Sequence, residues 1–171
     1  DGSRFWVHSI LTPIKDAGGA LKGYWKIVRD LTERKRTEEK FRGLLESAPD
    51  AIIIVQEDGL IALVNRQTEH LFGFARAEML GQPIEMLIPQ RFRQAHAGYR
   101  TGYFANPSVR PMGANLTLFA LRKDGSEFPV EISLSPLVTD EGILVSSAIR
   151  DITERWKAEQ KCSPSNSLTG L

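Results

Sequence analysis

The chain has 171 residues, of which 42% are hydrophobic and 25% are charged, as in a soluble globular protein of one domain or slightly more. Its 22 basic and 21 acidic residues nearly balance, which argues against a protein that binds nucleic acid through phosphate contacts. The single cysteine, Cys162, excludes a disulfide framework and a cysteine zinc site. No apolar run is long enough to span a membrane and the first residues form no signal segment, so we expect a cytoplasmic piece of a longer chain.

A β-hairpin is expected in the first 30 residues. Phe5, Val7 and Leu11 are apolar positions that alternate with polar neighbours, which is the period of a half-buried strand. The Gly-containing segment 16–19 supplies the turn to a second strand.

This hairpin recurs near the end of the chain, followed by the same motif. Residues 1–7 (DGSRFWV) return as 124–130 (DGSEFPV), and residues 29–34 (RDLTER) return as 150–155 (RDITER). The offset of 121 to 123 residues is the size of a whole domain. We therefore interpret residues 1–30 as the C-terminal strands of a preceding, truncated domain and residues 47–151 as a complete second domain.

A linker or entry helix is expected over residues 31–46, between the two copies. Residues 30–42 are almost wholly charged, and apolar residues then follow at helical spacing from Phe41 to Ala48, before Pro49 ends the helix. Two readings stay open for this helix. It either forms a parallel coiled coil in a homodimer or is a solvated linker.

The second domain is expected to fold as α+β. Asp58-Gly59 is a hairpin signal, and Asn65 is placed to cap a helix that Gly73 ends. The expected strands span 51–55, 60–64, 116–121, 128–134 and 143–149, and the expected helices span 65–72, 76–80 and 91–104. Two strands, several helices and then three strands predict an antiparallel sheet with helices on one face.

Each copy of the repeat is expected to end in a strand, a cap and a helix. Asp151 precedes Glu154 by three residues and Asp30 precedes Glu33 in the same way, which predicts a capping box before each helix. An exit helix is expected over residues 152–161, and a disordered tail over residues 162–171.

Several short motifs form an ordered set along the chain. They are residues 44–51 (LLESAPDA), Asp58-Gly59, Val64-Asn65, Leu71-Phe72-Gly73, Gly81, residues 122–126 (RKDGS), residues 128–130 (FPV) and residues 150–155 (RDITER). Together they resemble a PAS domain of the bacterial sensory type, with the family's PAC signal-transfer motif at Asp-Ile-Thr. The resemblance covers about residues 38–161 and the N-terminal fragment.

The resemblance implies a five-stranded antiparallel sheet flanked by helices, acting as a sensor or dimerisation module. It implies a host such as a histidine kinase of a two-component phosphorelay, a cyclic-di-nucleotide enzyme or a transcriptional regulator. The partners would be a second copy bound through the linker helices, a linked upstream PAS domain and a linked output domain. The residues that would transfer the signal are Arg150, Asp151, Thr153, Glu154, Asp30 and Thr32.

The working hypothesis is a relay from the domain to the exit helix. A change in the pocket or in the upstream module would shift the last strand, and the cap formed by Asp151 and Thr153 would pass that shift on. No catalytic constellation is found, since phosphate-loop, metalloprotease and hydrolase motifs are absent. Glu69 and Glu85 are interpreted as surface charge. We therefore expect this chain to be no enzyme, although its parent protein could be one.

The sequence leaves open whether the second domain binds a cofactor, and His96 is the candidate ligand. Five residues lie within about 40° of one line on a helical wheel, which places them on the face toward the sheet. These are Phe92, Ala95, His96, Tyr99 and Tyr103. In the haem-binding, oxygen-sensing PAS group a histidine on this helix ligates iron, and the spacing from His96 to residues 122–125 is similar.

Three outcomes stay open for the space beneath this helix. His96 either ligates haem, with Tyr99 and Leu116 beside the cofactor, or is a hydrogen-bonded core residue in a module without a cofactor. The haem-binding PAS group has an arginine that contacts the bound gas where this chain has Asn115-Leu116. We therefore expect His96 to be a core residue. A small organic ligand could use the volume left by Ser147 and its small neighbours. A photoactive flavin is disfavoured, because the only cysteine lies beyond the domain.

Overall fold

The computed structural model describes residues 5–112, 117–140 and 142–162. The chain divides into two compact units, residues 1–47 and residues 48–171. Among the described residues, no helix is both long and apolar enough to cross a bilayer.

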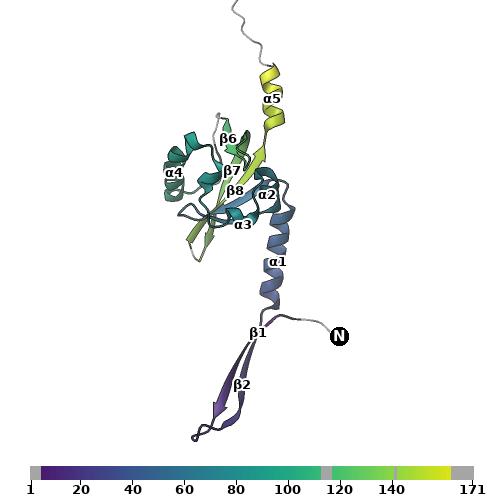
Figure 1. Ribbon diagram of the computed structural model, residues 1–171, viewed down its shortest axis with the longest axis vertical. Coiled ribbons are helices and arrows are strands. Elements are labelled where there is room, and N and C mark those ends of the chain that lie inside the picture. Colours follow the sequence, from purple (N-terminus) through teal and green to yellow (C-terminus); the bar gives the residue numbers. More distant parts are fainter. Residues whose placement is uncertain (1–4, 113–116, 141, 163–171) are drawn as a thin grey trace, which may run out of the picture. The chain divides into compact units, whose positions relative to one another are not determined.

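The first unit is a β-hairpin followed by a helix (Figure 1). Strand β1 (Val7–Lys15) pairs antiparallel with β2 (Leu21–Asp30), and helix α1 (Thr32–Ser47) follows. The carboxylate of Asp16 closes the turn, because it accepts the backbone N–H groups of Gly18 and Ala20 at 2.9 and 3.0 Å. The predicted hairpin and helix are both present.

Every residue of the two strands except Gly23 is exposed. Phe5 is 63% exposed, and Trp6 and Trp25 are 61% exposed. The alternation in the sequence predicted a half-buried strand; the strand forms, but no described element of this unit covers its apolar side chains.

The second unit is built on an antiparallel sheet in the order β4-β3-β8-β7-β5, with β6 also paired to β7. The strands are β3 (Ala51–Val55), β4 (Ile61–Val64), β5 (Arg110–Pro111), β6 (Leu118–Leu121), β7 (Glu127–Thr139) and β8 (Gly142–Asp151). The predicted α+β fold with an antiparallel sheet is confirmed. The observed sheet has one strand more than the five that were expected. The extra strand is the two-residue β5, which pairs with β7 beyond the stretch that pairs with β6.

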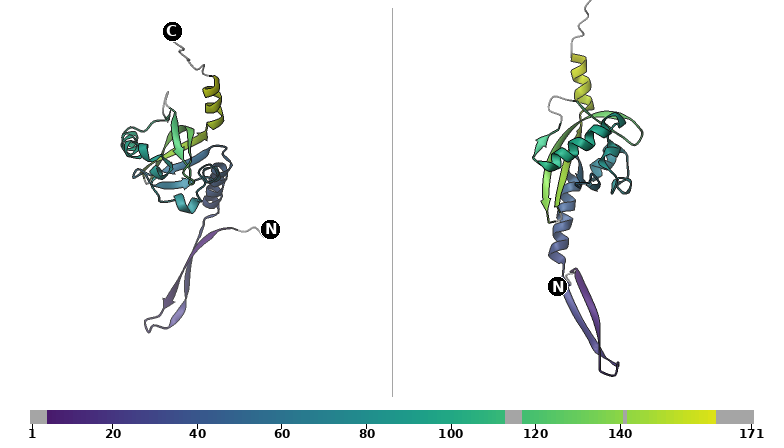
Figure 2. Two further views of the ribbon diagram at one scale, coloured as in Figure 1. Left: turned by 45° about the horizontal axis from the view of Figure 1, so that its top comes forward. Right: turned by 90° about the vertical axis from the view of Figure 1, so that its left-hand side faces the viewer.

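The helices of this unit fall between β4 and β5 and after β8 (Figures 1 and 2). They are α2 (Arg66–Phe72), α3 (Arg76–Met79), the 3₁₀ helix η1 (Ile84–Leu87), α4 (Gln90–Ala105) and α5 (Thr153–Cys162). The 3₁₀ helix was not predicted, because a single turn is too short to show a hydrophobic period. Helix α5 begins at Thr153 and includes Cys162, which was predicted to belong to the tail over residues 162–171; the other residues of that predicted tail lie outside the described residues.

Asn65 joins the first hairpin to the helical segment, as predicted. Its side-chain oxygen accepts the backbone N–H of Thr68 at 3.0 Å and that of Ile52 at 2.9 Å, while its amide donates to the Asp50 carbonyl. Asn65 is fully buried, so these bonds satisfy a polar group that would otherwise be costly to bury. Gly73, at φ 75°, ends the helix in the left-handed conformation that glycine adopts freely.

The core of the second unit lies between the sheet and the short helices. Phe72 of α2 and Phe128 of β7 pack edge to face with ring centroids 5.7 Å apart, and both are almost completely buried. Ile53 of β3 and Met79 of α3 belong to the same cluster. Phe72 also lines a cavity between α4 and the sheet.

Candidate functional site: a cavity and the junction that follows it

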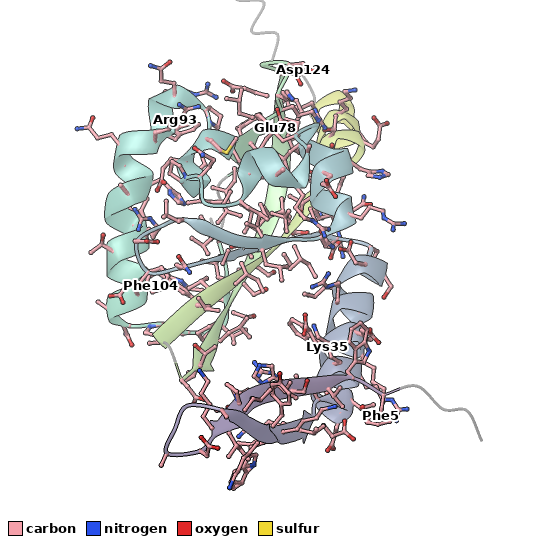
Figure 3. All side chains as sticks on the ribbon, turned by 60° about the horizontal axis from the view of Figure 1, so that its bottom comes forward. Phe5, Lys35, Glu78, Arg93, Phe104 and Asp124 are labelled. Carbon is pink, nitrogen blue, oxygen red and sulfur yellow. The ribbon has the colours of Figure 1, made fainter. Side chains whose placement is uncertain are left out.

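A cavity of about 450 Å³ lies between α4 and the sheet of the second unit. Figure 3 labels Arg93 and Phe104 near the two ends of α4, the helix that bounds the cavity on one side. Its lining is mainly aliphatic and aromatic, and residues from η1, α4, β5, β6, β7 and β8 contribute to it. A cavity of this size is within the range of small-molecule sites.

The predicted stripe on α4 reaches the cavity, but only part of it is buried. All five residues line the cavity: Phe92, Ala95, His96, Tyr99 and Tyr103. Tyr103 is 4% exposed, whereas Tyr99 is 72% exposed and lies at the rim. The helical wheel thus identified the correct face, while the depth of each residue depends on what the sheet places opposite it. Leu116, the third candidate cofactor contact, lies outside the described residues.

His96 belongs to a polar cluster at the cavity wall. Its Nδ1 lies 3.0 Å from Oε1 of Glu85, and Arg100 donates from Nε to the same oxygen at 3.2 Å. The Glu85 side chain is 15% exposed, so the interpretation of Glu85 as surface charge was wrong. Burial alone would raise the pKa of Glu85, but the hydrogen bonds from His96 and Arg100 outweigh burial, and the pKa lies below its usual value.

Arg100 also holds the turn between β3 and β4. Its Nη1 donates to the carbonyl of Glu57 at 2.9 Å. Gly59 in the same turn has φ 91°, and a Cβ atom there would lie 2.4 Å from the Arg100 guanidinium carbon. A side chain at position 59 would therefore combine a strained backbone with displacement of this guanidinium. The Asp-Gly pair signalled the turn in the sequence, but not the arginine packed on it.

The second part of the site is the junction where β8 ends and α5 begins. Oδ1 of Asp151 accepts the backbone N–H of Thr153 at 2.8 Å and the Thr153 hydroxyl at 2.5 Å. Its other oxygen accepts Nη2 of Arg122 at 2.7 Å. The predicted capping box is wrong in one respect: Glu154 does not reach back, because its side chain is 94% exposed and pairs with Lys157. Its predicted role in signal transfer is untested.

Arg122 ties this junction to the core. Its Nε donates to the carbonyl of Leu71 at 3.0 Å, and its guanidinium lies over the Phe128 ring at 3.7 Å. Sequence reasoning identified Arg122 only as part of a motif. Its role depends on Leu71, 51 positions away, and no local pattern reports a contact of that range.

Helix α5 contacts the domain through its first turn. Ile152 donates its backbone N–H to Pro129 at 3.1 Å, and the backbone N–H of Trp156 closes the turn on the Ile152 carbonyl at 2.8 Å. The Trp156 indole packs edge to face on Phe119 of β6 with centroids 6.1 Å apart, and Phe119 is among the residues that line the cavity. Arg150, one residue before Asp151, forms two 2.9 Å bonds with the carboxylate of Asp50 at the entrance of the domain.

The junction in the first unit has the same plan. Asp30 accepts the backbone N–H of Thr32 at 2.8 Å, and Leu31 donates to the Trp6 carbonyl at 2.8 Å. The hydrogen bonds to Thr32 hold the pKa of Asp30 below its usual value. The repeated motif therefore builds the same local geometry twice. Among the described residues, no cluster of three or more His, Cys, Asp or Glu could hold a metal ion.

The second unit is thus an α+β domain with an apolar cavity over an antiparallel sheet, followed by a capped helix. A PAS fold family model matches residues 39–152, and a PAS domain model matches residues 1–33. The chain therefore belongs to the PAS family.

Relatives with a known role include sensors and a kinase. The Sensor protein FixL of Bradyrhizobium diazoefficiens is 26% identical over 163 residues, 91% of this chain and 32% of FixL. The Oxygen sensor protein DosP of Escherichia coli is 28% identical over 107 residues, 63% of this chain and 13% of DosP. The Cell-division control histidine kinase PdhS of Brucella ovis is 24% identical over 123 residues, 72% of this chain and 12% of PdhS. The chain thus spans a third or less of each of these relatives.

Solved structures agree on the fold. The PAS domain of an HTR-like protein from Haloarcula marismortui matches with a TM-score of 0.60 and 24% sequence identity. The match covers 70% of this chain and 95% of that domain.

Proposed function

We propose that the second unit is a sensory relay, in which occupancy of the cavity changes the position of β8 and thereby the start of α5. One observation carries the proposal. Strand β8 lines the cavity with Val145, Ser147 and Ile149, and the same strand ends at Asp151, whose carboxylate holds the first turn of α5. A shift of β8 therefore moves the cap directly.

Two further contacts support the route. Trp156 of α5 packs on Phe119 of the cavity lining, and Arg122 links Asp151 to the core through Leu71 and Phe128. A helix cap is worth about 1 kcal/mol and a switch needs a coupling free energy of about 1–3 kcal/mol, so contacts of this kind supply the right order of energy.

The relatives support placing this relay in a multidomain signalling protein. Their names describe a sensor, an oxygen sensor and a histidine kinase, and each is at least three times longer than the matched stretch. In this proposal the second unit itself performs no chemistry. It passes a signal from its cavity, or from the PAS segment before it, to whatever follows α5.

The relay is tested on the whole chain with Trp156 as the reporter. Replacing Trp6 and Trp25 with phenylalanine leaves Trp156 as the only tryptophan, and decanol serves as a neutral amphipathic probe of the cavity. We expect decanol to bind and to shift the Trp156 emission, and we expect Asp151→Ala to keep binding but reduce the shift. Ser147→Leu, which takes up part of the cavity from β8, is the control that should weaken both the binding and the shift. Binding with no change at Trp156 would contradict the relay.

A haem-based sensor is the second candidate, and the placement of His96 favours it. His96 lines the cavity, and its Nδ1 contact with Glu85 is the kind of second contact that orients a metal-bound histidine and leaves Nε2 for the iron. His96 would hold the haem, which would supply the gas-binding iron. A Soret band that forms with haemin and is lost in His96→Ala would support this candidate. A band that persists in the variant would exclude His96 as the ligand.

Dimerisation along α1 completes the proposal. Phe41 and Leu44 are 51% and 71% exposed on this helix, whose charges pair internally between Lys35, Glu38 and Arg42. A parallel coiled coil with a second copy would cover the two apolar side chains. We expect the chain to sediment as a dimer and the Phe41→Glu/Leu44→Glu variant as a monomer. Equal masses for the two proteins would contradict this interface.

A further inference from the structure

The charged side chains in the cavity lining are arginines. Beside its mainly apolar residues, the lining contains Arg100 and Arg110, and it contains no aspartate or glutamate among the described residues. Such a wall favours a ligand with an apolar body and a negative end.

The two arginines differ in what already neutralises them. Arg100 is bound to the Glu85 carboxylate and to the Glu57 carbonyl, so its guanidinium is engaged within the protein. Arg110 of β5 instead lies over the Tyr103 ring, 5.0 Å from its centroid, and in the described part of the chain no carboxylate pairs with it. Arg110 therefore has hydrogen-bond donors available for a ligand.

The Tyr103 ring beneath Arg110 is itself held in place. Tyr103 is 4% exposed, and its hydroxyl donates to the carbonyl of Ser108 at 2.5 Å. A ring held in this way restricts the guanidinium stacked on it, which lowers the entropy that binding would cost. Arg110 is exposed, so a ligand head group could reach it from solvent while the ligand's apolar part fills the cavity.

We propose that the cavity binds an amphipathic monocarboxylate, whose carboxylate pairs with the guanidinium of Arg110 and whose apolar part packs between α4 and the sheet. A guanidinium presents parallel N–H donors that match the two oxygens of a carboxylate. This inference rests on the proposed function, because it names the class of ligand that the sensory cavity takes.

Calorimetric titration of the whole chain tests the carboxylate subsite with three probes of equal chain length. These are decanoate, decanol and decylamine, which differ in the charge of the head group. We expect decanoate to bind about tenfold or more tightly than decanol, since a hydrogen bond between two charged groups is stronger than one to a neutral hydroxyl. Decylamine should bind more weakly than either.

Variants assign the preference to Arg110. Arg110→Gln should lower the affinity for decanoate by about tenfold and leave that for decanol unchanged, because it removes the charge and keeps a polar side chain. Arg155→Gln, on α5 and outside the cavity, is the matched control and should change neither affinity. Circular dichroism of each variant confirms that it is folded.

The outcomes separate this inference from the proposed function. Equal affinities for decanoate and decanol, an undiminished preference for decanoate in Arg110→Gln, or no binding of decanoate to the folded chain would each overturn the carboxylate subsite. The relay survives the first two outcomes if Trp156 still responds to decanol. Conversely, Arg110-dependent binding of decanoate without any response at Trp156 would support the subsite and contradict the relay.

Discussion

The chain contains the same hairpin, cap and helix twice, and the two copies differ in what surrounds them. In the first unit β1 and β2 are exposed throughout, whereas in the second unit β8 lies between β3 and β7 and contributes to the cavity lining. The cap is nevertheless the same in both, with Asp30 and Asp151 each accepting the backbone N–H two residues on. The junction is therefore encoded locally, while its connection to a cavity comes only from the complete sheet.

One substitution changes the details of the cap. In the first copy the backbone N–H of Trp6 donates to the Thr32 hydroxyl at 3.1 Å. The equivalent residue in the second copy is Pro129, which has no N–H to donate. Both aspartates bind the hydroxyl of the following threonine, and Asp151 additionally accepts a hydrogen bond from Arg122, a contact that extends into the core.

The largest predicted contrast between the copies concerns the phenylalanine of the repeated Asp-Gly-Ser motif. Phe128 is 2% exposed and packs on Phe72, so Phe128→Ala should destabilise the second unit by about 3–5 kcal/mol. Phe5 holds the equivalent position in the first copy and is 63% exposed, so Phe5→Ala should cost less than about 0.5 kcal/mol. Urea unfolding measures both losses: Trp156 fluorescence, with Trp6 and Trp25 replaced by phenylalanine, follows the second unit, and Trp6 and Trp25 fluorescence, with Trp156 replaced by phenylalanine, follows the first. Similar losses for the two variants would show that the copies are packed alike.

A smaller contrast is expected between the turn glycines. Gly59→Ala combines a positive φ with a clash against the Arg100 guanidinium, and should cost about 2–3 kcal/mol. Gly19 has φ 87° but no atom within 4 Å of a Cβ built there, so Gly19→Ala should show the backbone cost alone, about 1–2 kcal/mol. Thermal unfolding of the two variants gives the comparison. An equal loss would mean that Arg100 moves aside freely.

A smaller difference in stability is expected between variants that remove the capping aspartate of each copy. Asp151→Ala removes the cap of α5 and leaves Arg122 without its carboxylate, so we expect a loss of about 1–2 kcal/mol and faster amide exchange in the first turn of α5. Asp30→Ala removes only the cap of α1 and should raise exchange there to a lesser extent. Hydrogen–deuterium exchange resolved by peptide measures both. Equal effects would show that the Arg122 contact contributes nothing.

The smallest effect is a dependence of stability on acid pH. The folded-state pKa of Glu85 lies below its ordinary value near 4.5, so between the two values the unfolded chain binds more protons than the folded chain. This contribution to stability is complete above about pH 4.5 and is lost as the pH falls through the folded pKa. Glu85→Gln should therefore lose less stability than the unaltered chain below pH 4.5. His96→Phe removes one lowering hydrogen bond and should behave in between. Parallel curves for all three proteins would contradict this account.

The elements that the sequence predicted well are those set by local signals. Asn65 and Gly73 bound α2 because a capping side chain and a left-handed glycine act within one turn. The repeat predicted both hairpins and both caps for the same reason. Long-range contacts could not be read in this way: Glu85 was taken for surface charge because the approach of His96 and Arg100 depends on how η1 lies against α4. Glu154 fits the spacing of a capping box, but its side chain remains in solvent and pairs with Lys157.

In the proposed relay the cavity of the second unit is coupled to the start of α5. Ser147→Leu places extra volume in the cavity from β8 itself, and amide exchange at residues 152–156 reports the response, with residues 31–35 of the first copy as the internal control. We expect exchange to change severalfold at the α5 junction, to stay unchanged at the α1 junction, and to respond much less when Asp151→Ala is also present. Unchanged exchange at residues 152–156, or the same change in both copies, would contradict it.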